Sequence, residues 1–301
     1  MSWLAVSLVI FSALLHASWN LLGKKVSPTV AFFSLAFLAG TLPLTPIVLP
    51  FVWDQGAVLF HLLPLLLLSG FCQAIYCSAL ALSYAEGAMS VAYPLARSIP
   101  VMLVAVISSV LGMQALLSLE AYIGVFLVLL GAVLLPMQHL RDFKVGNYFS
   151  RCMLLALLAA SATAGYSIAD KIAIDQLADH LPQSGLIVAV IYIWLEGIAA
   201  CIFLFTVQLV RADDRHKLKT VLASQKKSIA LTGAMITLTY LLVLWAMQLS
   251  ENISAIVALR QVSIPIGALL GVLLFKEQLG WVKSVALILL CAGVFLILSP
   301  V

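Results

Sequence analysis

Charged side chains are scarce in this sequence. Only 9% of its 301 residues are Asp, Glu, Lys or Arg, whereas 64% are hydrophobic. In a soluble globular domain about a quarter of the residues are charged, so this chain has too few to cover a surface that faces water. The composition therefore excludes an ordinary soluble domain and predicts that much of the surface faces lipid.

The sequence also lacks the motifs of several common protein classes. It has no glycine-rich phosphate-binding loop, no zinc-type spacing of Cys and His, and no basic patch along one face. Its net charge of +4 is small, so we expect no nucleic-acid partner. Because the cofactor- and metal-binding motifs are missing, we also expect no cofactor and no metal. The five cysteines all lie within apolar runs, which is typical of small core residues rather than of a disulfide framework.

The first apolar run extends from Trp3 to Leu22, and the basic pair Lys24 and Lys25 follows it. A secretory signal peptide carries its positive charges before the apolar run. The opposite order, together with a run long enough to span a membrane, predicts a retained first helix.

Long apolar runs are what the sequence has in abundance. A helix needs about 20 apolar residues to cross the hydrocarbon core of a bilayer. The runs are continuous instead of alternating with polar residues, which favours helices over a β-barrel. Short breaks rich in glycine, proline or charge separate them. The ten predicted spans are 3–22, 30–50, 61–83, 89–111, 119–137, 152–171, 184–209, 228–249, 253–274 and 280–299.

The basic residues are distributed unevenly among the loops between these spans. Thirteen of the 16 Lys and Arg residues fall in odd-numbered loops, six of them in the loop 211–227. Loops rich in Lys and Arg remain on the cytoplasmic side of a membrane. We therefore predict that the odd loops are cytoplasmic and that both chain ends lie on the other side of the plasma (inner) membrane.

Two ordered sequence matches relate the two halves of the chain. FSALLHASWNLLGKK (11–25) matches LAASATAGYSIADKI (158–172) at a shift of 147 residues, and LARSIP (95–100) matches LRQVSIP (259–265) at a shift of 165. The loop 211–227 absorbs the difference of 18 residues. The matches predict an all-α integral membrane fold of two five-helix repeats, residues 1–137 and 152–301, joined by a basic loop at 138–151. Because five is odd, the second repeat is inverted relative to the first.

On these features the sequence resembles the EamA-type ten-helix branch of the drug/metabolite transporter superfamily. The resemblance covers nearly the whole chain and rests on the duplicated five-helix unit, the HASWNLLGKK element, and the short acidic hairpin before a proline-containing helix. It implies alternating access by a basket of helices, and export of amino acids or related metabolites by proton coupling or exchange. Several members have cytoplasmic termini, whereas the loop charges of this chain predict the reverse.

Two arginines lie within predicted spans, Arg97 and Arg260. An arginine at the centre of a span costs about 2.5–3.5 kcal/mol on insertion scales. Each precedes a proline of the matched SIP sequence, where lost helix hydrogen bonds leave carbonyls free. The pair is interpreted either as cations that bind a carboxylate or phosphate in a central cavity, or as structural arginines that cap carbonyls or extend to the interface.

Other polar residues in the spans are candidates for solute binding. Glu196 is the deepest acid, and it is either a proton-coupling site or a counter-ion for Arg97 or Arg260. His16, Trp19 and Asn20 lie on one polar stripe, where they can bind a solute or satisfy a neighbouring helix. The remaining candidates are Tyr76, Tyr93, Gln261, Gln73 and Tyr166.

Together these features predict a secondary transporter that exports a small polar metabolite, such as an amino acid or an organic anion, by alternating access. The alternative is an integral membrane enzyme that acts on a lipid or lipid-linked substrate, although the acids are scattered and the histidines isolated. Expected partners are the small-molecule substrate and the lipid bilayer. Gly267 and Gly271 let another backbone approach closely, which fits packing within the chain or a homodimer equally well.

Overall fold

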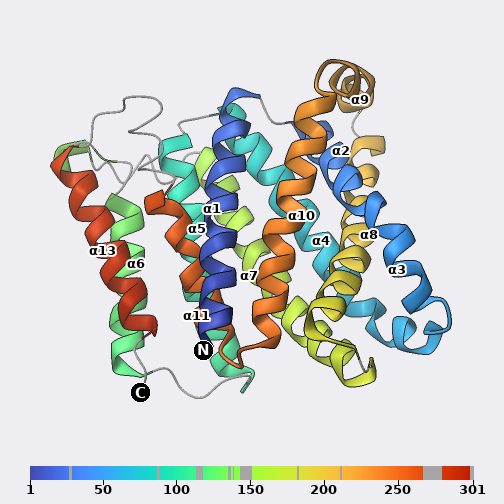
Figure 1. Cartoon of the computed structure of the whole chain (residues 1–301). Helices are drawn as coiled ribbons and strands as arrows, with labels where there is room; N and C mark the ends of the chain where they lie inside the picture. Colours follow the sequence, from blue (N-terminus) through green and yellow to red (C-terminus); the bar gives the residue numbers. More distant parts are fainter. Residues whose placement is uncertain are drawn as a thin grey trace.

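The structure is a computed structural model that describes residues 1–26, 29–86, 89–112, 118–134, 137, 139–142, 151–181, 183–210, 212–266 and 280–298. Within these ranges the chain forms helices, which lie side by side in one bundle (Figure 1), and no strand. The α-helices are α1 (Trp3–Lys25), α2 (Val30–Thr41), α3 (Thr45–Val52), α4 (Gly56–Glu86), α5 (Met89–Val110), α6 (Leu119–Leu134), α7 (Arg151–His180), α8 (Gly185–Val210), α9 (Ala212–Ser224), α10 (Lys226–Gln248), α11 (Ile253–Leu259) and α13 (Trp281–Leu298). Short 3-10 turns are η1 (Leu42–Leu44), η2 (Leu140–Asp142) and η4 (Arg260–Val262).

Helix is present in each of the ten apolar runs, but several bounds differ from the prediction. The loop predicted at 211–227 is wrong, because α9 occupies most of it. Val221 is buried there in the same apolar cluster as Val30 of α2, so packing stabilises a helix where the charges indicated a loop. Similarly, α7 continues to His180, well past the predicted end of that span at residue 171.

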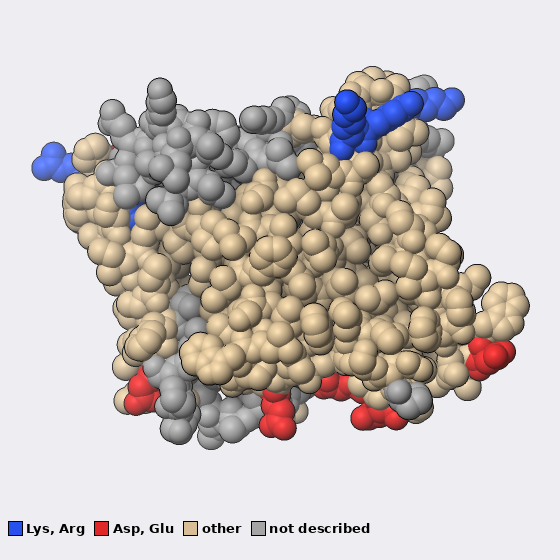
Figure 2. All heavy atoms as spheres, viewed as in Figure 1, with Lys and Arg blue, Asp and Glu red and all other residues tan. Residues whose placement is uncertain are grey.

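Among the described residues, five stretches of helix are long and apolar enough to cross a membrane by length and composition. They are Val30–Val52, Gly56–Ser83, Arg151–His180, Gly185–Val210 and Lys226–Gln248. Large apolar side chains point outwards from the bundle, and Phe60, for example, is 78% exposed. In Figure 2, Lys and Arg gather at one edge of the molecule and Asp and Glu at the opposite edge, with an uncharged belt between them. This surface is the kind that a helical membrane protein presents to lipid.

Local capping explains where two of the helices begin. Thr29 precedes α2, and its Oγ1 accepts a hydrogen bond from the backbone N–H of Phe32 at 3.2 Å. Asn252 precedes α11, and its Oδ1 accepts from the N–H of Ala255 at 2.9 Å. Each cap satisfies an N–H group that the helix itself cannot pair, so each position favours helix initiation.

Small residues bring pairs of helices into backbone contact. At Gly233 of α10 an added Cβ would lie 2.3 Å from the carbonyl oxygen of Ala36 in α2, and at Gly40 it would lie 2.1 Å from Oγ1 of Thr237. The pair α6 and α13 is equally close, since a Cβ at Gly293 would lie 2.6 Å from the oxygen of Gly124. Close approach through small residues is how helices associate in lipid.

The ninth predicted span is interrupted, whereas the sequence predicted one continuous helix at 253–274. Regular α-helix ends at Leu259, and η4 follows over Arg260–Val262. Pro265 lacks an N–H group, and its ring excludes the carbonyl of Gln261 from ordinary α-helical geometry. The tighter turn places Arg260 at the break. The predicted glycine pair Gly267 and Gly271 lies outside the described residues.

Candidate functional site

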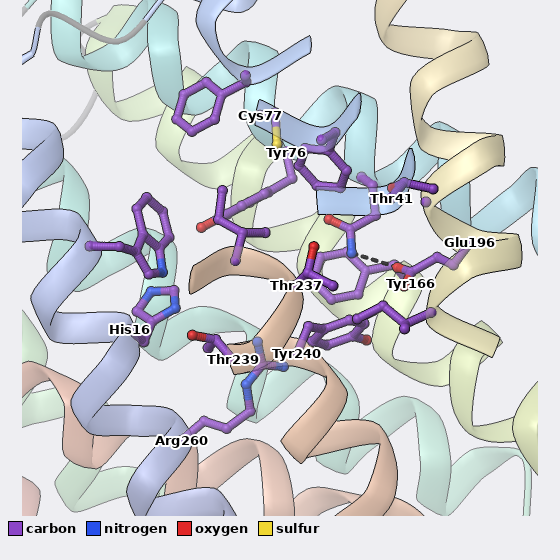
Figure 3. Close-up of a pocket in the computed structure, with 17 residues that line it drawn as sticks. His16, Thr41, Tyr76, Cys77, Tyr166, Glu196, Thr237, Thr239, Tyr240 and Arg260 are labelled. Carbon is purple, nitrogen blue, oxygen red and sulfur yellow. Dashed lines mark hydrogen bonds between the residues drawn. The ribbon is translucent and has the colours of Figure 1, made fainter. Parts of the chain in front are cut away.

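A cavity of about 60 Å³ lies inside the bundle, and helices from both halves of the sequence surround it (Figure 3). This volume is room for a few water-sized groups. The lining residues that carry polar atoms are His16, Trp19, Thr41, Gln73, Tyr76, Cys77, Tyr166, Glu196, Thr237, Thr239, Tyr240 and Arg260. The cavity therefore combines an apolar body with several convergent polar groups, as binding sites for small molecules do.

Arg260 and His16 lie on one side of the cavity (Figure 3). Only 6% of Arg260 is exposed, and its Cζ lies 5.3 Å from the centre of the Tyr240 ring, a distance suited to a cation–π contact. Its Nη1 has no hydrogen-bond partner. His16 is also buried and packs edge-to-face with Trp19, the two ring centres being 4.9 Å apart. This side can therefore offer hydrogen-bond donors to an anionic group.

Glu196 lies on the opposite side of the cavity (Figure 3). It comes from α8 and is 2% exposed. Nε2 of Gln73 donates to its Oε1 at 2.6 Å, and Oγ of Ser69 donates to the same oxygen at 3.3 Å. Gln73 and Ser69 are one turn apart on α4, so that helix holds the carboxylate from one face.

Three tyrosine rings line the cavity and pack against one another. Tyr166 of α7 packs edge-to-face on Tyr76 of α4, with ring centres 6.1 Å apart, and on Tyr240 of α10, at 5.6 Å. Edge-to-face pairs at these separations are favourable and restrict the orientation of each ring. Within the described residues, neither Arg97 nor Arg260 forms an ion pair with an acid.

The arrangement suits binding of a polar solute better than bond-breaking chemistry. A buried guanidinium on one side and a buried carboxylate on the other can each hold one end of a small solute. Among the described residues, no group of three or more His, Cys, Asp or Glu is arranged to hold a metal ion.

The structure brings together five of the predicted site residues, since the lining includes His16, Trp19, Tyr76, Glu196 and Arg260. Of the weaker candidates, Gln73 and Tyr166 also line the cavity. The side chains of Asn20 and Tyr93 lie outside the described part of the chain.

Arg97 and Gln261 are buried but are directed elsewhere. Nη2 of Arg97 donates to Oγ of Ser263 at 3.1 Å, which ties α5 to the segment that follows the helix break. Nε2 of Gln261 donates to the carbonyl of Val257 at 3.0 Å. For Arg97 the structural interpretation therefore fits these contacts better than the solute-binding one.

Sequence reasoning missed Asp170 and Tyr240, which belong to one buried network. The hydroxyl of Tyr192 donates to Oδ1 of Asp170 at 2.8 Å, and the hydroxyl of Tyr240 donates to Oδ2. Asp170 lay at the end of a predicted span and next to Lys171, a position typical of a solvated helix end. Because α7 continues beyond it, Asp170 is fully buried instead.

An apolar groove of about 430 Å³ lies on the outside of α8, where it faces α2, η1 and α3. Its lining includes Leu38, Leu42, Ile198 and Phe205, and it shares Thr41 with the central cavity. A Cβ at Gly197 would lie 2.3 Å from Oγ1 of Thr41, so α2 and α8 are in contact between the groove and the cavity.

The comparisons with known proteins concern the fold. A solved structure titled "Crystal structure of protein" superposes on the chain with a TM-score of 0.69 and 16% sequence identity, covering 98% of this chain and 96% of that one. At this identity the likeness shows the fold alone. No protein-family model and no curated protein matches the sequence.

Proposed function

We propose that this chain is a secondary transporter of a small polar metabolite, such as an amino acid or an organic anion. The central cavity binds the solute and becomes accessible to the two sides of the membrane in turn. The observation that carries the proposal is Arg260, a buried arginine that faces an internal cavity and has an unpaired Nη1. Ionisable residues within membrane-crossing bundles mark solute and ion pathways, because their burial is costly without such a role.

The predicted inverted repeat supports this proposal. In the proposed arrangement, residues 1–137 and 152–301 form two five-helix repeats of opposite orientation, and residues 138–151 connect them. Cavity residues come from both ranges, such as His16 and Gln73 from the first and Glu196 and Arg260 from the second. Inverted-repeat transporters hold their solute near the membrane midplane between the repeats, often beside a discontinuous helix such as the one broken at η4.

The family, location and direction are parts of the same proposal. We assign the chain to the EamA-type branch of the drug/metabolite transporter superfamily on its sequence motifs, and we propose export across the plasma (inner) membrane. Helix α9, whose Lys217 and Lys219 are exposed, lies at the basic edge of the molecule, whereas α1 begins at the other edge (Figures 1 and 2). By the positive-inside rule, the basic edge is cytoplasmic and the N-terminus is not.

The apolar groove beside the cavity favours a second candidate, an integral membrane enzyme acting on a lipid or lipid-linked substrate. An acyl chain fits a groove of this lining, and Thr41 is common to the groove and the cavity. This candidate predicts a chemically altered lipid product, whereas the transporter predicts movement of an unaltered solute.

A ligand screen followed by a transport assay tests the proposal. The purified protein is screened by thermal shift against amino acids, organic acids and phosphorylated metabolites, and solutes that raise its Tm are then tested for movement in proteoliposomes. Arg260→Ala is expected to weaken binding by about 1.5–3 kcal/mol, roughly ten- to a hundred-fold, because a charged hydrogen bond is lost.

Arg141→Ala is the matched control, since Arg141 lies in the exposed turn η2, away from the cavity lining. It is expected to bind and move solutes like the wild type. If no solute moves in wild-type proteoliposomes while a lipid is converted, the enzyme candidate replaces the transporter. If Arg260→Ala binds and transports normally, Arg260 is not the solute-binding cation.

A further inference from the structure

Asp170 is a buried carboxylate surrounded by hydroxyl groups, and Ser69 of α4 is one of them. Asp170 lies on α7, is fully buried, and accepts hydrogen bonds from Tyr192 of α8 and Tyr240 of α10. Among the described residues, no cation lies within ion-pair distance of Asp170. A carboxylate buried in such a bundle without an ion-pair partner is costly, and it therefore requires a functional explanation.

Two tyrosine hydroxyls donate hydrogen bonds to Asp170, whereas the shorter of the two hydrogen bonds to Glu196 comes from an amide. A tyrosine hydroxyl can donate or accept a hydrogen bond, so Tyr192 and Tyr240 can satisfy Asp170 whether it is ionised or protonated. The shorter bond to Glu196 comes from the amide nitrogen of Gln73, which can only donate. The surroundings of Asp170 thus accommodate both of its protonation states.

Tyr240 connects this carboxylate to the solute cavity. Its hydroxyl contacts Asp170, its ring lines the cavity, and the guanidinium of Arg260 lies over its face at 5.3 Å. A change in the hydrogen bonding of the Tyr240 hydroxyl therefore acts directly on a wall of the cavity and on the cation that faces it. Asp170 itself is not part of the lining, so it acts through Tyr240.

Several other titratable groups surround Asp170. Cys72 of α4 and Glu196 of α8 lie within electrostatic range of it, as does Arg260 of η4. Because buried charges interact strongly, protonation of Asp170 and of Glu196 is linked. On α5, which also packs against α7, Arg97 is directed to Ser263 instead. On α7 itself, Lys171 is directed to Asp175 and to the carbonyl of Met247.

We propose that Asp170 binds the proton that drives transport and that Tyr240 transmits its protonation state to the solute cavity. This inference rests on the proposed transport function. A proton from one side of the membrane adds to Oδ2 and forms a neutral carboxylic acid. The new acid O–H donates to the Tyr240 oxygen, and the Tyr240 hydroxyl hydrogen turns towards the cavity. Release of the proton to the other side restores the original bonds, so no other reactant is consumed.

Infrared difference spectroscopy of the lipid-reconstituted protein tests the proton site directly, with the proton as the probe. The wild type is expected to show a protonated-carboxyl band that disappears as the pH is raised. Asp170→Asn is expected to lose this band. Asp175→Asn, which changes an exposed carboxyl on the same helix, is expected to keep it. Retention of the full band in Asp170→Asn overturns the proposal.

Transport by proteoliposomes tests the coupling. With a mixture of labelled amino acids as the probe, the wild type is expected to accumulate label in response to a pH gradient. Asp170→Asn is expected to lose accumulation while still exchanging label for unlabelled solute. Gradient-driven accumulation by Asp170→Asn overturns the coupling role alone, whereas the absence of any solute movement by the wild type overturns the proposed function and the coupling role together.

Tyr240→Phe keeps the test decisive if Asp170→Asn fails to fold. This variant retains the ring beneath Arg260 and removes only the hydroxyl. It is expected to shift both the midpoint of the carboxyl band and the pH profile of transport. A purely structural tyrosine would change stability and leave both midpoints where they were, and that result overturns the proposal.

Discussion

At the scale of single residues, Glu196 is held by two donors at different distances. The bond from Gln73 is 2.6 Å long, and the bond from Ser69 to the same oxygen is 3.3 Å long. Hydrogen bonds weaken at the longer end of this range. The two donors therefore contribute unequally to holding the carboxylate, although both come from the same helix.

We predict that Gln73→Met destabilises the protein more than Ser69→Ala does. Both changes remove one donor with little loss of volume, and loss of a hydrogen bond to a charged group costs about 1.5–3 kcal/mol. Gln73→Met is expected near the upper end of that range and Ser69→Ala below it. Thermal unfolding of the two variants in the same detergent measures the difference. Equal Tm values for both variants would contradict the inequality.

The sequence could identify some site residues but not others, for a physical reason. Arg260, Glu196 and His16 stand out because a polar side chain within an apolar run is conspicuous. Tyr240 stands out less, because a tyrosine in such a run is equally compatible with an ordinary core position. Asp170 was missed because Lys171 beside it indicated a solvated helix end. Only the structure shows that the helix continues and that Asp170 is buried.

At the scale of helices, the contact between α2 and α10 has no space for an added side chain. Backbone atoms of Ala36 and Gly40 lie within 3.0 Å of the position that a Cβ on Gly233 would take. A backbone carbonyl cannot rotate away as a side chain can, so the helices themselves must separate. The contact depends on glycine for its missing side chain and not for unusual backbone angles.

Gly233→Ala is predicted to destabilise the protein by about 1–3 kcal/mol, the usual cost of forcing extra volume into a packed interior. Gly56→Ala is the matched control, because nothing lies within 4 Å of its added Cβ at the start of α4. The control is expected to be neutral or slightly stabilising, since alanine favours helix more than glycine does. Thermal unfolding compares the two, and an equally stable Gly233→Ala would show that the helices separate freely.

The existence of most helices could be predicted from the sequence, but their interruptions could not. Apolar length alone indicates a helix, and lipid leaves no other way to pair the backbone. The break at η4 depends on how Pro265 is accommodated, and Ser263 beside it receives a hydrogen bond from Arg97, distant in the sequence. Likewise α9 depends on the burial of Val221, which hydropathy does not reveal in a basic segment.

At the scale of the whole molecule, the charged residues separate into two edges (Figure 2). Exposed Lys219 belongs to α9, whereas exposed Glu251 lies between α10 and α11, at the other end of α10. For a protein that crosses a membrane, this separation predicts which edge is cytoplasmic.

We predict that Lys219→Cys is labelled by a membrane-impermeant maleimide only after cells are permeabilised, whereas Glu251→Cys is labelled in intact cells. Both substitutions are made in a background whose five native cysteines are replaced by alanine. The cysteine-free background is the control and is expected to remain unlabelled. The reverse pattern would place the basic edge outside and contradict the predicted orientation.

The short helix α9 has a consequence for how the molecule can move. It joins α8 to α10 and packs on α2, with Val221 buried beside residues of that helix. An unstructured connection would let α8 and α10 shift independently, whereas a packed helix transmits a displacement of one to the others. Helices α2, α8 and α10, which carry Thr41, Glu196 and Tyr240, are therefore expected to move together. Opening of the cavity is accordingly expected at η4, which packs against α1, α11 and α13 instead.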